Sequence, residues 1–185
     1  MRTYITLAIF IIIAIGSFWF LQNLTKEPVS DTTSDSHFPD YFMENFSITS
    51  LNDLGQPEYV LKATKMLHYS DDDKAELDQP FLNIKQPNND ITLRASRAVF
   101  LQQENIIYLH DKVIIHRAAS QTQSELSIFT DYLKIDTKLH IAETHLAAQV
   151  KTPEAELNTI GLKIDNIQGT VTLQSEVKGT YEAAN

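Results

Sequence analysis

The sequence predicts an all-β protein of antiparallel strands that follows a single apolar helix at the N-terminus. Three observations predict this. Short runs rich in Ile, Val, Leu, Thr and Tyr alternate with clusters of turn residues after residue 40. The tetrapeptide Leu-Lys-Ile-Asp occurs at 133–136 and again at 162–165. Residues 3–25 contain no charged side chain.

The N-terminal segment has the length and composition of a membrane-spanning helix. Ile5–Leu21 is almost wholly apolar, and about 20 residues with a rise of about 1.5 Å each match a hydrocarbon core of about 30 Å. The run ends in the bulky residues 18–21 and offers no small-residue cleavage site, which favours an uncleaved anchor over a signal peptide. Arg2 and the terminal amine precede it and Lys26 alone follows, so we expect a cytoplasmic N-terminus.

Beyond an anchor at 1–25, residues 26–40 are polar and carry two prolines, which predicts a flexible linker. Residues 41–185 then form the β domain. The chain has 15 basic and 24 acidic residues, and this acidic balance argues against nucleic acid or an anionic lipid surface as the main partner. It has no cysteine, so disulfides and thiolate metal sites are excluded.

The strand pattern is regular along the domain. We expect a first strand at 41–51, a turn at 52–55 and a second strand at 59–67. Further turns are predicted at 70–74, 87–90, 102–105, 136–138 and 165–169. This spacing indicates a sandwich, a barrel or a jelly roll. Residues 142–157 are ambiguous because Ala and Glu favour a helix, but we expect a strand with a loop there.

The repeated tetrapeptide predicts stacked hairpins with one apolar face. Leu139 and Ile141 follow the first copy, and Val171 and Leu173 follow the second. A looser copy runs from 99 to 113. Leu and Ile of each tetrapeptide should point one way and Lys and Asp the other. An isolated hairpin is marginal in water, so such units must stack, and stacking in series would create a continuous hydrophobic trough.

Several short motifs resemble the family of the lipopolysaccharide export protein LptC. They are Gly55-x-x-x-Tyr59-x-Leu61-x-Ala63, His68-Tyr69, Gln79-Pro80 and Gly161-Leu162, in this order after a single N-terminal span. The resemblance implies a single-pass protein of the Gram-negative cell inner membrane whose bulk is a twisted, partly open β-jelly roll in the periplasm. It also implies that the protein accepts lipopolysaccharide from an inner-membrane ABC transporter complex and passes it to a periplasmic bridge protein of related fold.

A hydrophobic trough could carry a lipid without catalysing any reaction. Transfer of one acyl chain of about 12 to 14 carbons into water costs on the order of 10 kcal/mol, at about 0.8 kcal/mol per CH₂. The same residues could equally form an ordinary core. We expect the lipid-binding lining to comprise Phe46, Ile48, Tyr59, Leu61, Ala63, Leu77, Leu93, Leu101, Leu109, Leu133, Ile135, Ile141, Leu162, Ile164, Val171 and Leu173.

The outermost strands are the expected docking edges. Unpaired strand edges accept a strand from another chain, so the bridge protein would pair with 170–181 and the membrane complex would face 42–51. Glu176 and Lys178 could instead discourage pairing. The alternative function is an anchored envelope scaffold that bridges proteins through these edges without binding lipid.

Catalytic and metal functions find little support in the sequence. Its six histidines lack an acidic ligand at a recurrent zinc spacing, and residues 71–73 fit a solvated turn better than a calcium site. It has no Gly-x-Ser-x-Gly motif and no phosphate-binding loop. We therefore expect a protein that is not an enzyme and has no cofactor, no catalytic residues and no metal site.

Overall fold

The computed structural model describes residues 17, 37–86, 89–121 and 123–181 of the chain. Among these residues, no helix is long and apolar enough to cross a membrane. The predicted anchor, apart from Ser17, and the linker up to residue 36 lie outside the described residues. Everything described below belongs to the compact unit that begins at His37.

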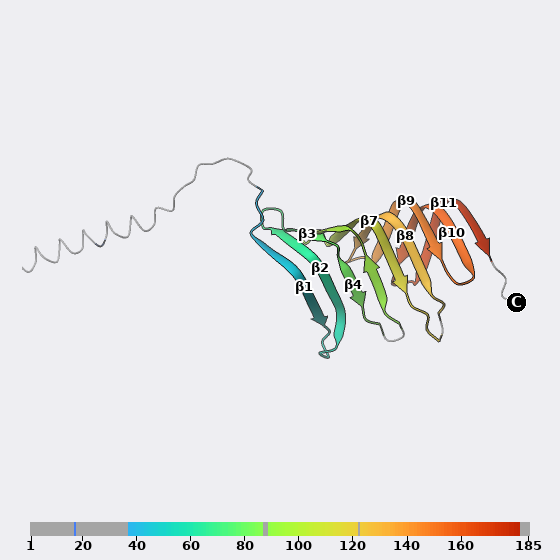
Figure 1. Ribbon diagram of the computed structural model, residues 1–185, viewed down its shortest axis with the longest axis horizontal. Helices are drawn as coiled ribbons and strands as arrows, with labels where there is room; N and C mark the ends of the chain where they lie inside the picture. The colour runs from blue at the N-terminus through green and yellow to red at the C-terminus, as the bar shows by residue number, and fades with distance from the viewer. Residues whose placement is uncertain (1–16, 18–36, 87–88, 122, 182–185) are drawn as a thin grey trace, which may run out of the picture. The chain divides into compact units, whose positions relative to one another are not determined.

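This unit is all-β and antiparallel, as the sequence predicts (Figure 1). The first and last strands have the predicted bounds, and the ambiguous region is two strands with a loop between them. The strands are β1 Tyr41–Leu51, β2 Pro57–Tyr69, β3 Lys74–Asp78, β4 Phe81–Ile84, β5 Ile91–Arg94, β6 Arg97–Leu101, β7 Ile106–Arg117, β8 Leu126–Asp136, β9 Ile141–Lys151, β10 Ala155–Asp165 and β11 Thr170–Tyr181.

One sheet contains all eleven strands, in the order β11-β10-β9-β8-β7-β5-β4-β2-β3-β6, with β1 also paired to β2. The long strand β7 pairs with β6 through residues 106–110 and with β5 through residues 114–117. The long strand β2 likewise pairs with β3 and β4 through its two halves. Four short strands therefore fill the space between β2 and β7, two in each half of the sheet.

Most of the long strands are irregular at one level, and this bend divides the sheet into two halves. Left-handed backbone conformations mark the level at Asn45, Asp111, Lys112, Gly161 and Glu176, with φ between 47° and 82°. The pairing register shifts at this level in the β7–β8, β8–β9, β9–β10 and β10–β11 ladders. Such irregularities bend a strand and increase its twist. The bend turns the two halves toward each other.

Four hairpins use turns of one design. In each, four residues connect the strands and the fourth has a left-handed conformation, namely Asp73, Asn105, His140 and Gly169. The two residues that flank each turn pair directly, as Asp136 does with Ile141 in β8–β9. Asp136 Oδ1 also accepts hydrogen bonds from the backbone N–H groups of the turn. The repeat seen in the sequence is therefore a repeated hairpin.

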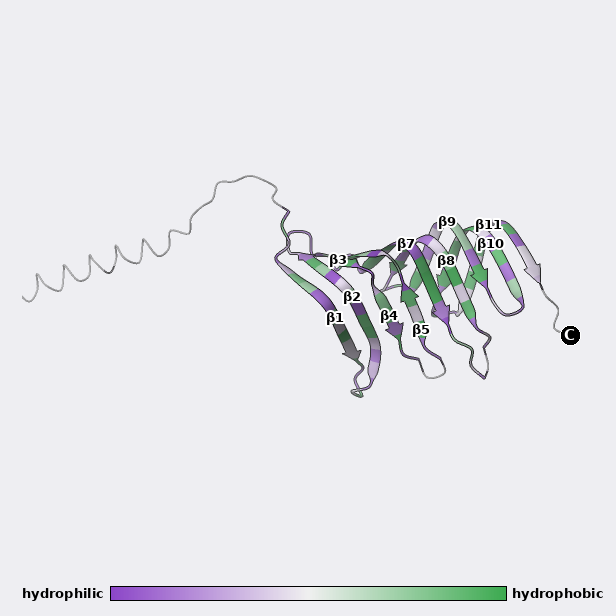
Figure 2. Cartoon of the chain, in the orientation of Figure 1, coloured by the Kyte–Doolittle hydropathy of each residue, from purple (hydrophilic) through white to green (hydrophobic). Residues whose placement is uncertain are grey.

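The core lies between the two halves. The most buried large side chains are at most 2% exposed. They come from both halves of the long strands: Leu109, Val113, Ile128, Leu133 and Leu162. One cluster gathers residues of β2, β3, β5, β6, β7 and β8, and a second gathers residues of β8, β9 and β10. Hydrophobic and hydrophilic residues alternate along much of the strands, and the central strands β7 to β10 bury their apolar face (Figure 2).

Candidate lipid-binding face

The inner face of the folded sheet carries two rows of residues, all apolar except His68, that cross the molecule from β1 to β10 or β11. In a row, each residue pairs directly with the next across the ladder, so its members share one face. The first row runs through Tyr41, His68, Ala75, Phe100, Ile107, Ile135, Ala142, Ile164 and Val171. The second runs through Ile48, Leu61, Leu82, Leu93, Ile115, Ile128, Val150 and Leu157.

The predicted lining residues divide by depth. Six are buried in the core: Ala63, Leu77, Leu93, Leu109, Leu133 and Leu162. Five are half-buried: Phe46, Leu61, Ile135, Ile164 and Leu173. Three are exposed, each by 37–39%, and lie on the strands nearest the ends of the sheet: Ile48, Tyr59 and Val171. The inner face therefore has a packed floor, with partly accessible apolar residues beside it and at both ends.

Two predicted lining residues, Leu101 and Ile141, lie on the outer face. Each flanks a four-residue turn and pairs directly across it, with Ile106 and Asp136 respectively. Their neighbours Phe100 and Ala142 take the inner positions and pack against the core. The prediction was wrong because it aligned Ile141 with an inner residue of the second hairpin. The turn instead places Ala142 at the position equivalent to Val171.

The predicted lining also omits several inner residues that are partly buried against the two clusters, among them Leu82, Phe100, Ile107, Ile115 and Leu157. Alternation within each strand would have found Ile107, because it lies two residues before Leu109. Ile115 lies two residues after the buried Val113, so the same count would also have found it.

Buried threonines satisfy the backbone at the bend. Thr130 Oγ1 donates to the carbonyl of Ala147 at 2.9 Å, and Thr159 Oγ1 donates to the carbonyl of Ser175 at 2.9 Å. Thr144 lies 3.4 Å from Thr130, hydroxyl to hydroxyl. A bulge leaves carbonyl groups without ladder partners, and a buried unpaired group costs about 1 to 3 kcal/mol. The threonines therefore allow the strands to bend without losing hydrogen bonds.

Both ends of the sheet are unpaired strand edges. Within the described residues, β1 pairs only with β2 and β11 pairs only with β10. Large apolar side chains are exposed on the edge strands, including Phe42 and Leu51 on β1 and Val177 and Tyr181 on β11. Both inner rows reach β1 and the first row also reaches β11, so an added strand could continue the apolar face across the junction.

A cluster of histidines and aspartates lies where the chain enters β1. His68 Nδ1 is 2.9 Å from Asp40 Oδ1, and the backbone N–H of Asp40 donates to the carbonyl of His68. The hydrogen bond with Asp40 raises the pKa of His68 and lowers the pKa of Asp40. Tyr41 stacks on the His68 ring at 4.5 Å. These contacts fasten the start of β1 to β2.

A second pair lies beside it at the β2–β3 turn. His37 Nδ1 is 2.8 Å from Asp71 Oδ2, which lowers the pKa of Asp71, and the His37 ring stacks on Tyr69 at 4.1 Å. With Asp72, these side chains could bring three ligand atoms within 4.8 Å of one another, but all three are exposed. The hydrogen bond and the ring stacking account for the arrangement without an ion.

The fold and this face define an antiparallel β-protein with a continuous apolar inner surface that connects two open edges. The family model "Lipopolysaccharide-assembly, LptC-related" matches residues 7–182, so the chain belongs to the LptC family and takes part in lipopolysaccharide transport. This confirms the resemblance seen in the sequence. No curated protein matches the chain.

One solved structure similar to this chain is that of LptH from Pseudomonas aeruginosa, described as the LptA homologous periplasmic component of the conserved lipopolysaccharide transport device. The two chains are 8% identical, with a TM-score of 0.46. The match covers 81% of this chain and 99% of LptH.

Proposed function

We propose that this chain is a passive, membrane-anchored carrier of lipopolysaccharide whose inner face covers the acyl chains. The observation that carries the proposal is the pair of apolar rows that cross the sheet from β1 to its C-terminal strands. Exposing each acyl chain to water costs about 10 kcal/mol, so a lipid with several chains could not cross water unaided. A continuous apolar surface that covers the chains removes this cost and needs no catalysed reaction.

The acyl chains would lie along the half-buried residues beside the packed floor. Ile107, Ile135 and Ile164 belong to one row, and Leu61 and Ile115 belong to the other. All five are half-buried and pack against the core clusters. Because Leu133 and Leu162 are fully buried, lipid would bind over the floor and widen the space between the two halves of the sheet.

In this proposal, residues 1–25 anchor the chain in the cell inner membrane as a single-pass helix, 26–40 are a linker, and 41–185 form a partly open jelly roll in the periplasm. An ABC transporter complex of the inner membrane delivers lipopolysaccharide at the β1 end. The β11 edge pairs with a periplasmic bridge protein of related fold, which receives it. The two exposed edges, and the apolar rows between them, support docking of a partner at each end.

Site-specific photo-cross-linking in the full chain tests the proposal. Probes at Ile107, Ile135 and Ile164 report on the inner face, and probes at Lys134 and Lys163 report on the outer face of the same strands. We expect lipopolysaccharide adducts from the inner positions and none from the lysines. Equal labelling of both faces would overturn lipid binding at the inner face.

The alternative is an anchored scaffold that bridges envelope proteins by strand pairing. The unpaired edges of β1 and β11 favour it, because they can pair with other chains whether or not lipid binds. Protein adducts from probes at Phe42 and Val177, without lipopolysaccharide adducts from the inner positions, would establish the scaffold instead.

A further inference from the structure

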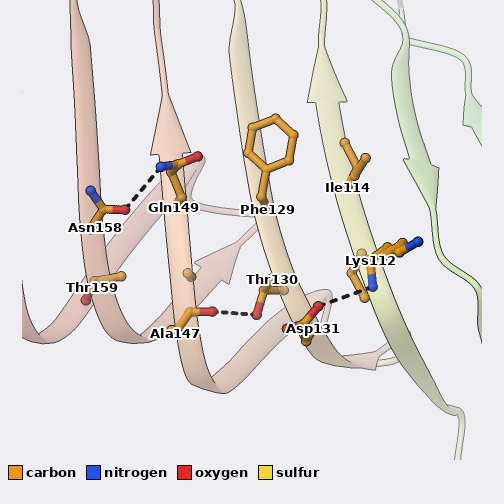
Figure 3. Close-up of a pocket in the computed structure, with 11 residues that line it drawn as sticks. Lys112, Ile114, Phe129, Thr130, Asp131, Ala147, Gln149, Asn158 and Thr159 are labelled. Carbon is orange, nitrogen blue, oxygen red and sulfur yellow. Dashed lines mark hydrogen bonds between the residues drawn. The ribbon is translucent and has the colours of Figure 1, made fainter.

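A hollow of about 520 Å³ lies on the outer face of the sheet, across β7, β8, β9 and β10 (Figure 3). We call it the outer hollow. One side is a cross-strand row in which Ile114, Phe129, Gln149 and Asn158 pair in register. The other side is formed by Lys112, Asp131 and Ala147. Ala147 has only a methyl group, and the residues between the two sides turn their side chains to the core, so the floor is strand backbone.

The outer hollow combines an aromatic ring with fixed polar groups. Gln149 Nε2 donates to Glu156 Oε1 at 2.8 Å and to Asn158 Oδ1 at 3.2 Å, which sets the orientation of both amides. Among the described residues, this arrangement leaves Gln149 Oε1 free to accept and Asn158 Nδ2 free to donate. Asp131 adds a carboxylate that accepts only one long hydrogen bond, 3.4 Å from the backbone N–H of Lys112. The ring of Phe129 stands between Ile114 and Gln149.

The surroundings exclude several ligand classes. Strands β7 to β10 are each paired on both sides, so no backbone groups remain for an added peptide strand. Lys112 is the single cation among the described lining residues and Asp131 adds a negative charge, so the hollow does not suit a phosphate group. Its polar groups would lose their hydrogen bonds to water under an acyl chain.

A saccharide fits the remaining chemistry. A sugar ring has an apolar face of C–H groups that packs on an aromatic ring, and its hydroxyl groups donate and accept at once. The free acceptor of Gln149, the free donor of Asn158 and the carboxylate of Asp131 match neighbouring hydroxyls. The volume lies within the range of about 300 to 1,000 Å³ that is usual for small-molecule sites. We propose that the outer hollow binds a saccharide.

A second hollow of about 190 Å³ extends the site toward β5. It shares Ile114 with the outer hollow and is also lined by Thr92, Arg94, His116 and Ser127. The two hollows therefore form a path along the outer face, with amide groups at the β10 end, the aromatic ring of Phe129 between, and hydroxyl and cationic groups at the β5 end. This extent matches an oligosaccharide of several rings, with any acidic sugar placed at Arg94.

Calorimetric titration of the full chain, in a detergent without a sugar headgroup, tests the proposal. The two probes are deacylated lipopolysaccharide core oligosaccharide and a cell-wall disaccharide of N-acetylglucosamine and N-acetylmuramic acid, which separate the two sources of saccharide in the envelope. Because neither probe has acyl chains, the result is independent of lipid binding at the inner face.

Two variants locate the binding. Ala147→Phe fills the outer hollow at an exposed strand position, and Asn158→Ala removes the free donor; each should weaken binding at least tenfold. Thr172→Phe adds the same ring to the outer face of β11, outside the hollow, and should bind like the parent chain. Absence of binding to both probes, or equal binding by Ala147→Phe and Thr172→Phe, would overturn the proposal.

Discussion

Leu133→Ala tests whether the floor of the inner face is a packed core. Leu133 is fully buried and pairs with the buried Leu109 across β7 and β8. The substitution removes three carbon atoms, worth about 2 kcal/mol of transfer free energy at about 0.8 kcal/mol per CH₂. The cavity that remains adds to this loss, so we expect the free energy of unfolding to fall by about 3 to 4 kcal/mol.

Urea denaturation followed by the far-ultraviolet circular dichroism of the β domain measures the effect. With an m-value of about 2 kcal/mol per M, the midpoint should fall by about 1.5 to 2 M. Leu139→Ala is the matched control, because Leu139 is 57% exposed in the β8–β9 turn and its truncation should change stability by less than about 0.5 kcal/mol. Similar midpoints for the two variants would show that the halves of the sheet do not pack against each other.

Three further predictions follow from the bend, the entry to β1 and the inner face. Gly161→Ala should lower the thermal midpoint, because φ is +82° and a Cβ there would lie 2.4 Å from Gln174 Oε1. The Asp40–His68 contact raises the pKa of His68 above 6.5. The stabilisation that protonated His68 gives to the folded state is therefore complete below pH 6.5 and is lost as the pH rises through the raised pKa. At the acid end the contact weakens as the pH falls through the lowered pKa of Asp40. Asp40→Asn should return the pKa of His68, measured by NMR titration, toward 6.5. An unchanged pKa of His68 would contradict Asp40 as the cause of the shift. Ile135→Asp should block lipopolysaccharide export while the chain still inserts into the membrane, and normal export would contradict lipid binding at the inner face.

The strands were predictable because their signals are local. The bounds of β1 and β11 follow from apolar runs that end at turn residues. The loop between β9 and β10 falls within the region that was expected to be a strand with a loop, and the strand assignment on either side holds despite the Ala and Glu content. Burial against neighbouring strands outweighs the weak intrinsic preference of these residues for a helix.

The face of the sheet on which each side chain lies was less predictable, because it depends on turn geometry. Leu101 and Ile141 look like inner residues by hydrophobicity, yet each directly flanks a turn whose fourth residue is left-handed. A shift of one residue moves a side chain to the opposite face of a sheet. The turn residues Asn105 and His140 therefore decide which neighbour is buried, and hydrophobicity alone does not.

The bend was not predictable from apolar periodicity. At Asp111 and Lys112 the extended backbone of β7 is interrupted, but Val113 is buried where an unbroken count from Leu109 also places it. The interruption thus leaves the inner pattern apparently regular in the sequence. Three buried threonines, which an apolar count omits, provide the hydrogen bonds at this level: Thr130, Thr144 and Thr159.

The two proposed binding surfaces lie on opposite faces of the same strands, and this limits how one molecule could use both. Strands β7 to β10 are fully paired, so nothing can pass between them. A glycolipid whose acyl chains lie beside Ile135 and Ile164 could reach the outer hollow with its sugar only by passing around an edge of the sheet. The strands end in short turns on one side, such as the four residues before Ile141, while the bend closes the other side. A saccharide bound at Phe129 therefore belongs to a second molecule or to a long glycan that folds back over the turns. Titration with saccharides of increasing length separates these two cases. A long glycan that folds back needs a minimum length to reach the outer hollow while its acyl chains are bound at the inner face. A saccharide that belongs to a second molecule needs no minimum length.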